Sequence, residues 1–268
     1  MNLLGIVQGR LTDTNKKNLQ VFPKDWGAEF NTAKKLKLDF IEFFTERKIN
    51  LKNPIWKIEK INVYQKYAKK NKLKIINFCD DYIISNSICS KYTFNYLKKL
   101  KKNLIILNIK NLILPMYGAS NISLNNIVKI SKHLKKIAKN FKNINILIEA
   151  NISPGEFNKI RELIHPHKIG FLFDTGNRIN LKRDMVEDIL KFNKEIKHIH
   201  IKDKNLRKKN VKLGTGLVDF DKVFLALKKI KYKRNFTLEN SRGNNAIKTA
   251  LENIRFIKKK IKKIHKKT

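Results

Sequence analysis

The chain has 268 residues, which is long for one ordinary domain but normal for a single α/β barrel. No apolar run approaches the ~20 residues that a membrane span needs, and the N-terminus has no signal-peptide pattern, so we expect a cytoplasmic protein without membrane contact. The two cysteines, Cys79 and Cys89, are too few for a disulfide framework or a thiolate metal cluster.

Charge is the most unusual feature of the composition. The chain has 60 lysine and arginine residues against 22 acidic ones, a net charge of +38. Such an excess can indicate nucleic-acid binding, but binding proteins usually concentrate their charge on one face. Here the lysines run from end to end beside many Asn and Ile residues, as an AT-rich genome favours. Nucleic acid is therefore the less favoured partner, whereas a positive field would still attract an anionic sugar phosphate.

Short apolar segments alternate with amphipathic ones along the chain, as expected for strands followed by helices. The strands are predicted at residues 3–8, 39–44, 73–79, 112–115, 144–148, 169–173, 198–203 and 236–238. The helices are predicted at 26–38, 54–71, 91–107, from 123, from a capping box at 153, at 186–192, at 219–230 and at the C-terminal end. About eight strand–helix units of this size predict a (β/α)₈ TIM barrel.

No linker rich in Pro, Gly or Ser interrupts this pattern, so we expect a single domain over residues 1–268. The competing architecture is a doubly wound open sheet. That fold needs a glycine-rich phosphate turn after an early strand, and the segment from Gly5 to Gly9 lacks the required spacing.

Polar side chains occupy the C-terminal ends of the predicted strands, where TIM barrels place their chemistry. These residues are Gln8, Glu42, Asp80, Glu149, Asp174, His200 with Lys202, and Glu239. The last four strands alone bring together three carboxylates and one imidazole. Converging carboxylates repel each other unless a cation neutralises them.

The sequence therefore predicts one divalent metal ion, such as Mn²⁺, Mg²⁺, Co²⁺ or Zn²⁺, bound by Glu149, Asp174, His200 and Glu239. His198 lies two residues before His200 on the same strand face. We expect it deeper in the barrel, as a hydrogen-bonded core residue and not as a ligand.

Seven short segments, in this order, resemble a known family. They are Gly5–Leu11 (GIVQGRL), Asp39–Glu42 (DFIE), Leu147–Glu149 (LIE), Phe173–Asn177 (FDTGN), His198–Asp203 (HIHIKD), Leu213–Gly216 (LGTG) and Asp219–Phe220 (DF). Together they resemble the sugar phosphate isomerase/epimerase members of the xylose-isomerase-like TIM-barrel superfamily. The resemblance covers nearly the whole chain, and it specifies the superfamily more than a substrate.

The resemblance implies one divalent ion on the four ligands and implies that Glu149 and Glu239 act as paired acid–base groups. Such enzymes remove a proton next to a carbonyl through a metal-stabilised enediolate. Returning the proton to the adjacent carbon gives isomerisation, and returning it to the opposite face gives epimerisation. Supporting substrate contacts are expected from Gln8, Arg10, Glu42, Asp80, Asn177, Lys202, Asp203 and Arg242.

Asn177 stands where epimerases of the superfamily often have a substrate-binding histidine, which speaks against a free-ketose epimerase. Arg10 and Arg242 are the candidate anion contacts. Glu42 and Asp80 have a structural alternative, which is to form salt bridges with barrel lysines.

Other functions remain open on the same scaffold. An apurinic-site endonuclease would suit the charge, but its three-metal cluster needs more histidines than this chain places at strand ends. A sugar or inosose-type dehydratase would use the same metal and enolate, and no residue separates it from an isomerase. A barrel that binds a sugar without turnover is a third alternative. A homo-oligomer through the outer helices is also compatible with the sequence.

Overall fold

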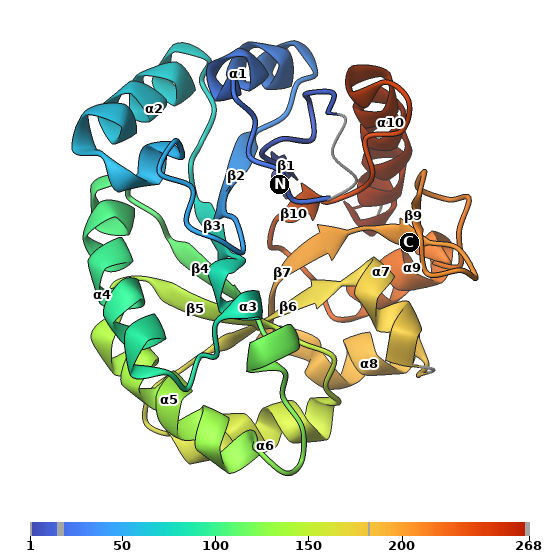
Figure 1. Cartoon of the computed structure of the whole chain (residues 1–268). Helices are drawn as coiled ribbons and strands as arrows, with labels where there is room; N and C mark the ends of the chain where they lie inside the picture. Colours follow the sequence, from blue (N-terminus) through green and yellow to red (C-terminus); the bar gives the residue numbers. More distant parts are fainter. Residues whose placement is uncertain (1, 15–18, 182, 266–268) are drawn as a thin grey trace. The chain divides into compact units, whose positions relative to one another are not determined.

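The computed structural model describes residues 2–14, 19–181 and 183–265. Within these residues eight strands form a closed parallel barrel in the order β1-β10-β7-β6-β5-β4-β3-β2 (Figure 1). The strands are β1 (Leu4–Val7), β2 (Phe40–Thr45), β3 (Asn77–Asp80), β4 (Asn111–Pro115), β5 (Asn145–Glu149), β6 (Gly170–Asp174), β7 (Ile196–Ile201) and β10 (Phe236–Leu238). The predicted TIM-barrel fold is thereby confirmed.

By internal contacts the chain divides into two compact units. Unit 1 comprises Met1–Phe40 and Leu172–Thr268, and unit 2 comprises Ile41–Phe171. That residues 1–268 form a single domain stays a prediction.

Unit 2 carries β3, β4 and β5, most of β2, and the helices that cover them. Its helical segments are η1 (Pro54–Trp56), α2 (Ile58–Lys70), α3 (Tyr82–Ser85), α4 (Lys91–Ile106), η2 (Gly118–Ser120), α5 (Ile127–Asn140) and α6 (Pro154–Ile164). Each long helix turns an apolar stripe inward; Phe43 of β2, for example, stacks on Tyr64 of α2 with ring centroids 4.3 Å apart.

An amide ladder fixes the strand starts in unit 2. Asn145 donates its side-chain N–H to the Asn111 amide oxygen at 3.0 Å, and Asn111 donates in turn to Asn77 at 2.8 Å. Asn77 then donates to the Glu42 carboxylate at 3.1 Å. Asn77, Asn111 and Asn145 are register partners. An asparagine at the same position of β3, β4 and β5 therefore links these three strands by side-chain hydrogen bonds.

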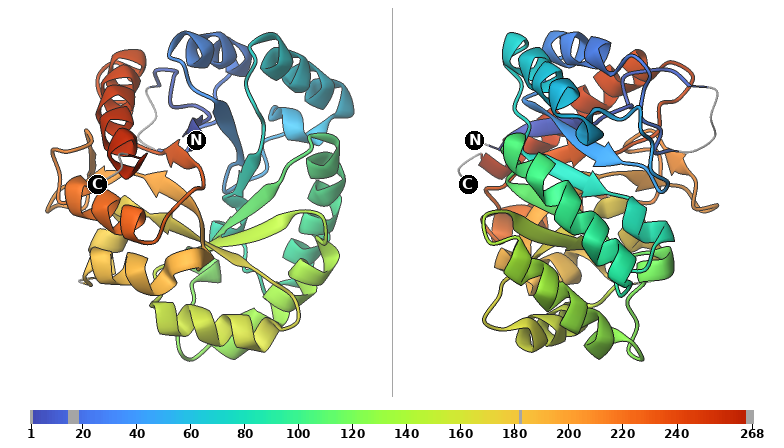
Figure 2. Two further views of the ribbon diagram at one scale, coloured as in Figure 1. Left: turned by 180° about the vertical axis from the view of Figure 1, so that it is seen from behind. Right: turned by 60° about the vertical axis from the view of Figure 1, so that its left-hand side comes forward.

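Unit 1 carries the paired strands β1, β10 and β7. Its other elements are α1 (Trp26–Lys35), α7 (Thr175–Arg178), η3 (Ile179–Leu181), α8 (Met185–Phe192), η4 (Asn193–Glu195), the short pair β8 (Asp203–Lys204) and β9 (Asn210–Val211), α9 (Phe220–Lys229) and α10 (Ala246–His265). Helices α9 and α10 lie side by side (Figure 2). They meet through the edge-on ring pair Phe220–Phe256, with centroids 5.4 Å apart.

Several boundaries differ from the predictions for local reasons. The helix predicted at 54–71 begins only at Ile58, because Lys57 is extended (φ −132°, ψ 127°) and separates it from a 3₁₀ turn. The helix predicted from Ser123 begins at Ile127, after a turn in which the Ser123 carbonyl accepts the Ile127 N–H. The strand predicted at 198–203 spans Ile196–Ile201.

Two other features of the fold bear on the predictions. Asp219 caps α9, and Ser153 with Glu156 forms the predicted capping box at the start of α6. Among the described residues, no helix combines the length and apolar character that crossing a bilayer would require.

Candidate metal and active site

Three ligand-type side chains converge in unit 1 at the carboxyl ends of β6, β7 and β10. Asp174, His200 and Glu239 each offer a ligand atom, and these atoms all lie within 4.8 Å of one another. All three residues are buried. The register explains their meeting, because His200 pairs with Thr237 and Glu239 follows two residues later. We call these three residues the cluster.

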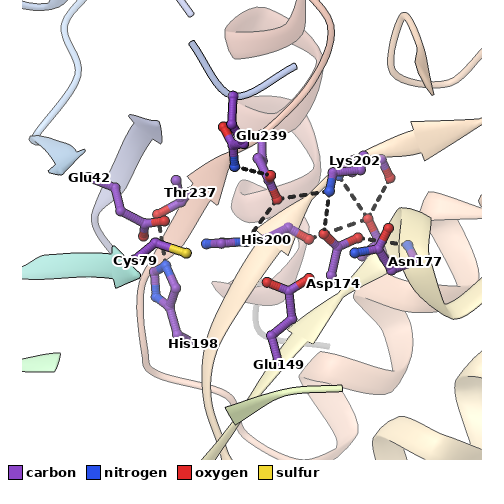
Figure 3. Close-up of polar contacts among 12 residues, drawn as sticks. Glu42, Cys79, Glu149, Asp174, Asn177, His198, His200, Lys202, Thr237 and Glu239 are labelled. Atoms are coloured by element: carbon purple, nitrogen blue, oxygen red, sulfur yellow. Dashed lines mark hydrogen bonds and ion pairs between the residues drawn. The ribbon is translucent and has the colours of Figure 1, made fainter. Parts of the chain in front are cut away.

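Lys202 supplies a positive charge to the cluster. Its ammonium Nζ lies 2.8 Å from Asp174 Oδ2 and 2.9 Å from Glu239 Oε2. His200 Nδ1 lies 2.9 Å from the same Glu239 Oε2 (Figure 3). Burial by itself would raise the pKa of Glu239, but the positive charges of Lys202, His200 and Arg10 hold it well below its usual value.

The segment Asp174–Asn177 explains how Lys202 is positioned. The Thr175 hydroxyl donates to the Lys202 carbonyl at 2.6 Å and accepts the Lys202 N–H at 3.0 Å. Gly176 leaves room for the lysine stem, since a Cβ there would lie 2.7 Å from Lys202 Cγ. The Asn177 N–H donates to Asp174 Oδ1 at 2.8 Å, which leaves Oδ2 facing the ammonium.

The second oxygen of Glu239 is held by the loop that follows β1. Gln20 donates its Nε2–H to Glu239 Oε1 at 2.8 Å. The buried Arg10 guanidinium donates to Gln20 Oε1 at 2.5 Å and lies 3.9 Å from Glu239 Oε1. Sequence reasoning missed Gln20, because a glutamine in a loop carries no periodic signal.

Glu29 of α1 holds this loop in place through hydrogen bonds. Its carboxylate accepts the N–H groups of Gly9 at 2.6 Å and Leu11 at 3.0 Å and the Thr12 hydroxyl at 2.7 Å. Burial raises the pKa of Glu29, and these hydrogen bonds act in the opposite direction. The sequence could have indicated a buried role for Glu29, because it lies four positions before Ala33 on the same face of α1, and that face is buried.

Three other predicted substrate contacts of unit 1 form hydrogen bonds within the protein, and their role in substrate binding stays a prediction. Gln8 donates to the Trp26 carbonyl at 3.2 Å, Arg242 to the Gly9 carbonyl at 2.6 Å, and Asn177 Oδ1 accepts from Lys204 Nζ at 2.8 Å. Burial lowers the pKa of Arg242.

Asp203 accepts four backbone N–H groups at 2.9 to 3.1 Å, from Lys204, Gly214, Gly216 and Val218. Its carboxylate therefore organises the loop at 213–218, and its role as a substrate contact stays a prediction. His198 bonds the Thr237 hydroxyl at 2.7 Å, as befits a core residue.

Three predicted residues lie in unit 2. Glu149 ends β5, is buried, and accepts a hydrogen bond from the Tyr117 hydroxyl at 3.0 Å. Asp80 ends β3 and accepts from the hydroxyls of Thr45 and, at 2.9 Å, Tyr96. Burial raises the pKa of Asp80 to about 6 despite these bonds. Glu42 is buried at the end of the asparagine ladder.

The cluster fits a divalent metal ion. Two carboxylates and an imidazole are borderline-to-hard ligands, and burying them together requires a compensating positive charge. The ammonium of Lys202 lies against both carboxylates and supplies one such positive charge.

Comparisons with known proteins agree with this architecture. A model of the family described as xylose isomerase-like TIM barrel matches residues 30–260. An inosose dehydratase of Bacillus cereus (strain AH820) is 27% identical over 156 residues, which are 48% of this chain and 51% of that protein. The chain thus spans about half the length of the curated relatives it matches.

Solved structures resemble the whole chain at low sequence identity. D-allulose 3-epimerase from Methylomonas sp., in complex with D-allulose, has a TM-score of 0.74 at 18% identity, over 97% of both chains. The IolI protein, solved with a zinc atom, has a TM-score of 0.75 at 15% identity, over 99% of this chain and all of its own. At these identities the likeness shows the fold.

Proposed function

Since the chain belongs to the family of xylose isomerase-like TIM barrels, we propose that it is a divalent-metal-dependent isomerase or epimerase of a sugar or sugar phosphate. The observation that carries the proposal is the buried cluster of Asp174, His200 and Glu239 at the carboxyl ends of three barrel strands. TIM-barrel enzymes place their catalytic groups at these strand ends.

The metal ion would be held by the cluster, with Glu149 proposed as the fourth ligand. When bound, such an ion supplies positive charge that acidifies the C–H bond next to a substrate carbonyl. The likeness to the zinc-containing IolI protein supports a metal here.

The acid–base work falls to Glu149 and Glu239 in this proposal. One carboxylate removes the proton next to the carbonyl, and the same or the other carboxylate returns it to the neighbouring carbon or to the opposite face. The contacts of each side chain suit an orienting role. Tyr117 donates to Glu149 Oε1, and Gln20 donates to Glu239 Oε1, so a hydrogen bond from a neighbouring side chain orients each carboxylate.

The substrate is proposed to carry anionic or polar oxygens. Arg10 and Lys202 place two buried cationic groups beside Glu239. Sugars and sugar phosphates have the oxygen atoms that such groups bind, and the similar D-allulose 3-epimerase structure contains a ketose.

A dehydratase is the second candidate, and the inosose dehydratase of Bacillus cereus favours it. It would begin with the same proton abstraction and then expel a hydroxyl group as water. The two activities therefore share the first step and differ in the product.

The test is metal-dependent exchange of a substrate C–H proton into D₂O. Pools of ketoses, aldoses, inososes and their phosphates would be followed by proton NMR, with Mn²⁺ or Mg²⁺ added after chelation. Exchange that requires metal is expected. A product that has lost one water would identify the dehydratase.

Glu149→Gln should abolish this exchange while the circular dichroism spectrum is unchanged. Gln retains the size of the side chain but lacks the charge that binds a metal or accepts a proton. The matched control is Glu187→Gln, at a side chain that is 56% exposed and forms an ion pair with Lys191. Near-wild-type exchange in Glu149→Gln would remove this residue from the mechanism. No exchange in any pool, with nicking of abasic-site DNA, would establish the endonuclease alternative.

A further inference from the structure

Lys202 bonds the same two carboxylates that a metal ion would use. Its Nζ lies 2.8 Å from Asp174 Oδ2 and 2.9 Å from Glu239 Oε2, and its side chain is only 6% exposed. A divalent ion held by Asp174 and Glu239 would be bound by the same carboxylates that the ammonium contacts. An ammonium and a metal ion would then compete for one small volume.

The position of the ammonium is built into the fold. The Thr175 hydroxyl bonds both the N–H and the carbonyl of Lys202, which fixes the backbone from which the side chain projects. The stem then crosses the face of Gly176, where an added Cβ would force it to shift. The side chain is thereby directed toward the cluster, and Figure 3 shows its Nζ in contact with the carboxylates of Asp174 and Glu239.

We propose that Lys202 is an internal cation of the cluster, which a divalent metal ion must displace in order to bind Asp174 and Glu239. This inference rests on the metal site proposed above. Two cations within a few ångströms in a buried site repel strongly. The lysine therefore weakens metal binding, and it neutralises the paired carboxylates whenever it occupies the site.

Lys202→Met tests the inference, because methionine fills the space of the stem without the charge. The dissociation constant for Mn²⁺ would be measured by titration calorimetry on the chelator-treated full chain, together with the Mn²⁺-induced rise in Tm. We expect Lys202→Met to bind Mn²⁺ at least about tenfold more tightly than the wild type, with a larger rise in Tm.

Lys212→Met is the matched control. It removes an ammonium that also pairs with a carboxylate, that of Glu252 at 2.8 Å, outside the cluster. Its affinity for Mn²⁺ should equal that of the wild type.

Gly176→Ala provides a second variant in case Lys202→Met does not fold. The added methyl group would lie 2.7 Å from Lys202 Cγ and push the stem away, so tighter Mn²⁺ binding is again expected. Unchanged or weaker binding in the folded variants, beside a wild type that binds Mn²⁺, would overturn the inference and leave the metal site standing. Absence of binding in all proteins would overturn the proposed metal site itself, and the inference with it.

Discussion

Asp80 should make the stability of the protein depend on pH. Its carboxylate is fully buried, and the hydroxyls of Thr45 and Tyr96 are its side-chain donors in the described part of unit 2. Burial raises its pKa from 3.8 to about 6. Asp80→Asn removes this titration, whereas the amide oxygen can still accept from both hydroxyls.

The magnitude follows from the pKa shift. One pKa unit corresponds to ~1.4 kcal/mol, so ionising Asp80 in the folded protein lowers the free energy of unfolding by about 3 kcal/mol. Because the folded pKa is the higher one, the stabilisation is fully present only below about pH 3, well under the unfolded pKa of 3.8. It is lost as the pH rises through about 6. About 2 kcal/mol of the loss falls between pH 4 and pH 8.

The assay is urea unfolding of the wild type and Asp80→Asn at intervals from pH 4 to pH 8. All other groups titrate in both proteins, so the difference between the two free energies isolates Asp80. From pH 4 to pH 8 the free energy of unfolding of Asp80→Asn should rise by about 2 kcal/mol relative to that of the wild type. Tyr96→Phe removes a donor to the carboxylate and should shift the change to higher pH. A difference that stays constant with pH would refute the reasoning.

Two further predictions concern buried carboxylates of unit 1. Asp188→Ala should lower the free energy of unfolding by about 3–5 kcal/mol in urea titrations, because the buried Arg178 guanidinium loses its carboxylate partner; a loss below about 1 kcal/mol would contradict this. Asp203→Ala should accelerate amide hydrogen exchange at Gly214, Gly216 and Val218, whose N–H groups lose their acceptor. Unchanged exchange there would show that Asp203 does not organise the loop.

Much of the fold could be predicted from the sequence alone. Alternating apolar segments indicated eight strand–helix units, and the capping residues Ser153 and Asp219 marked two helix starts. These signals are local, since a strand face, a helix stripe and a cap each depend on residues a few positions apart. The ligand-type residues Asp174, His200 and Glu239 could be chosen because a parallel barrel places all strand ends at one rim.

The contacts of those residues were decided by the tertiary structure. Gln20 meets Glu239 across 219 positions, and nothing near Gln20 in the chain indicates this. Asp203 and Lys202 are neighbours in one motif, yet one organises a backbone loop and the other enters the cluster. A sequence specifies which groups can form hydrogen bonds and ion pairs. Which partner each polar group finds depends on how distant segments pack, because a buried polar group must take the partner that the fold brings within reach.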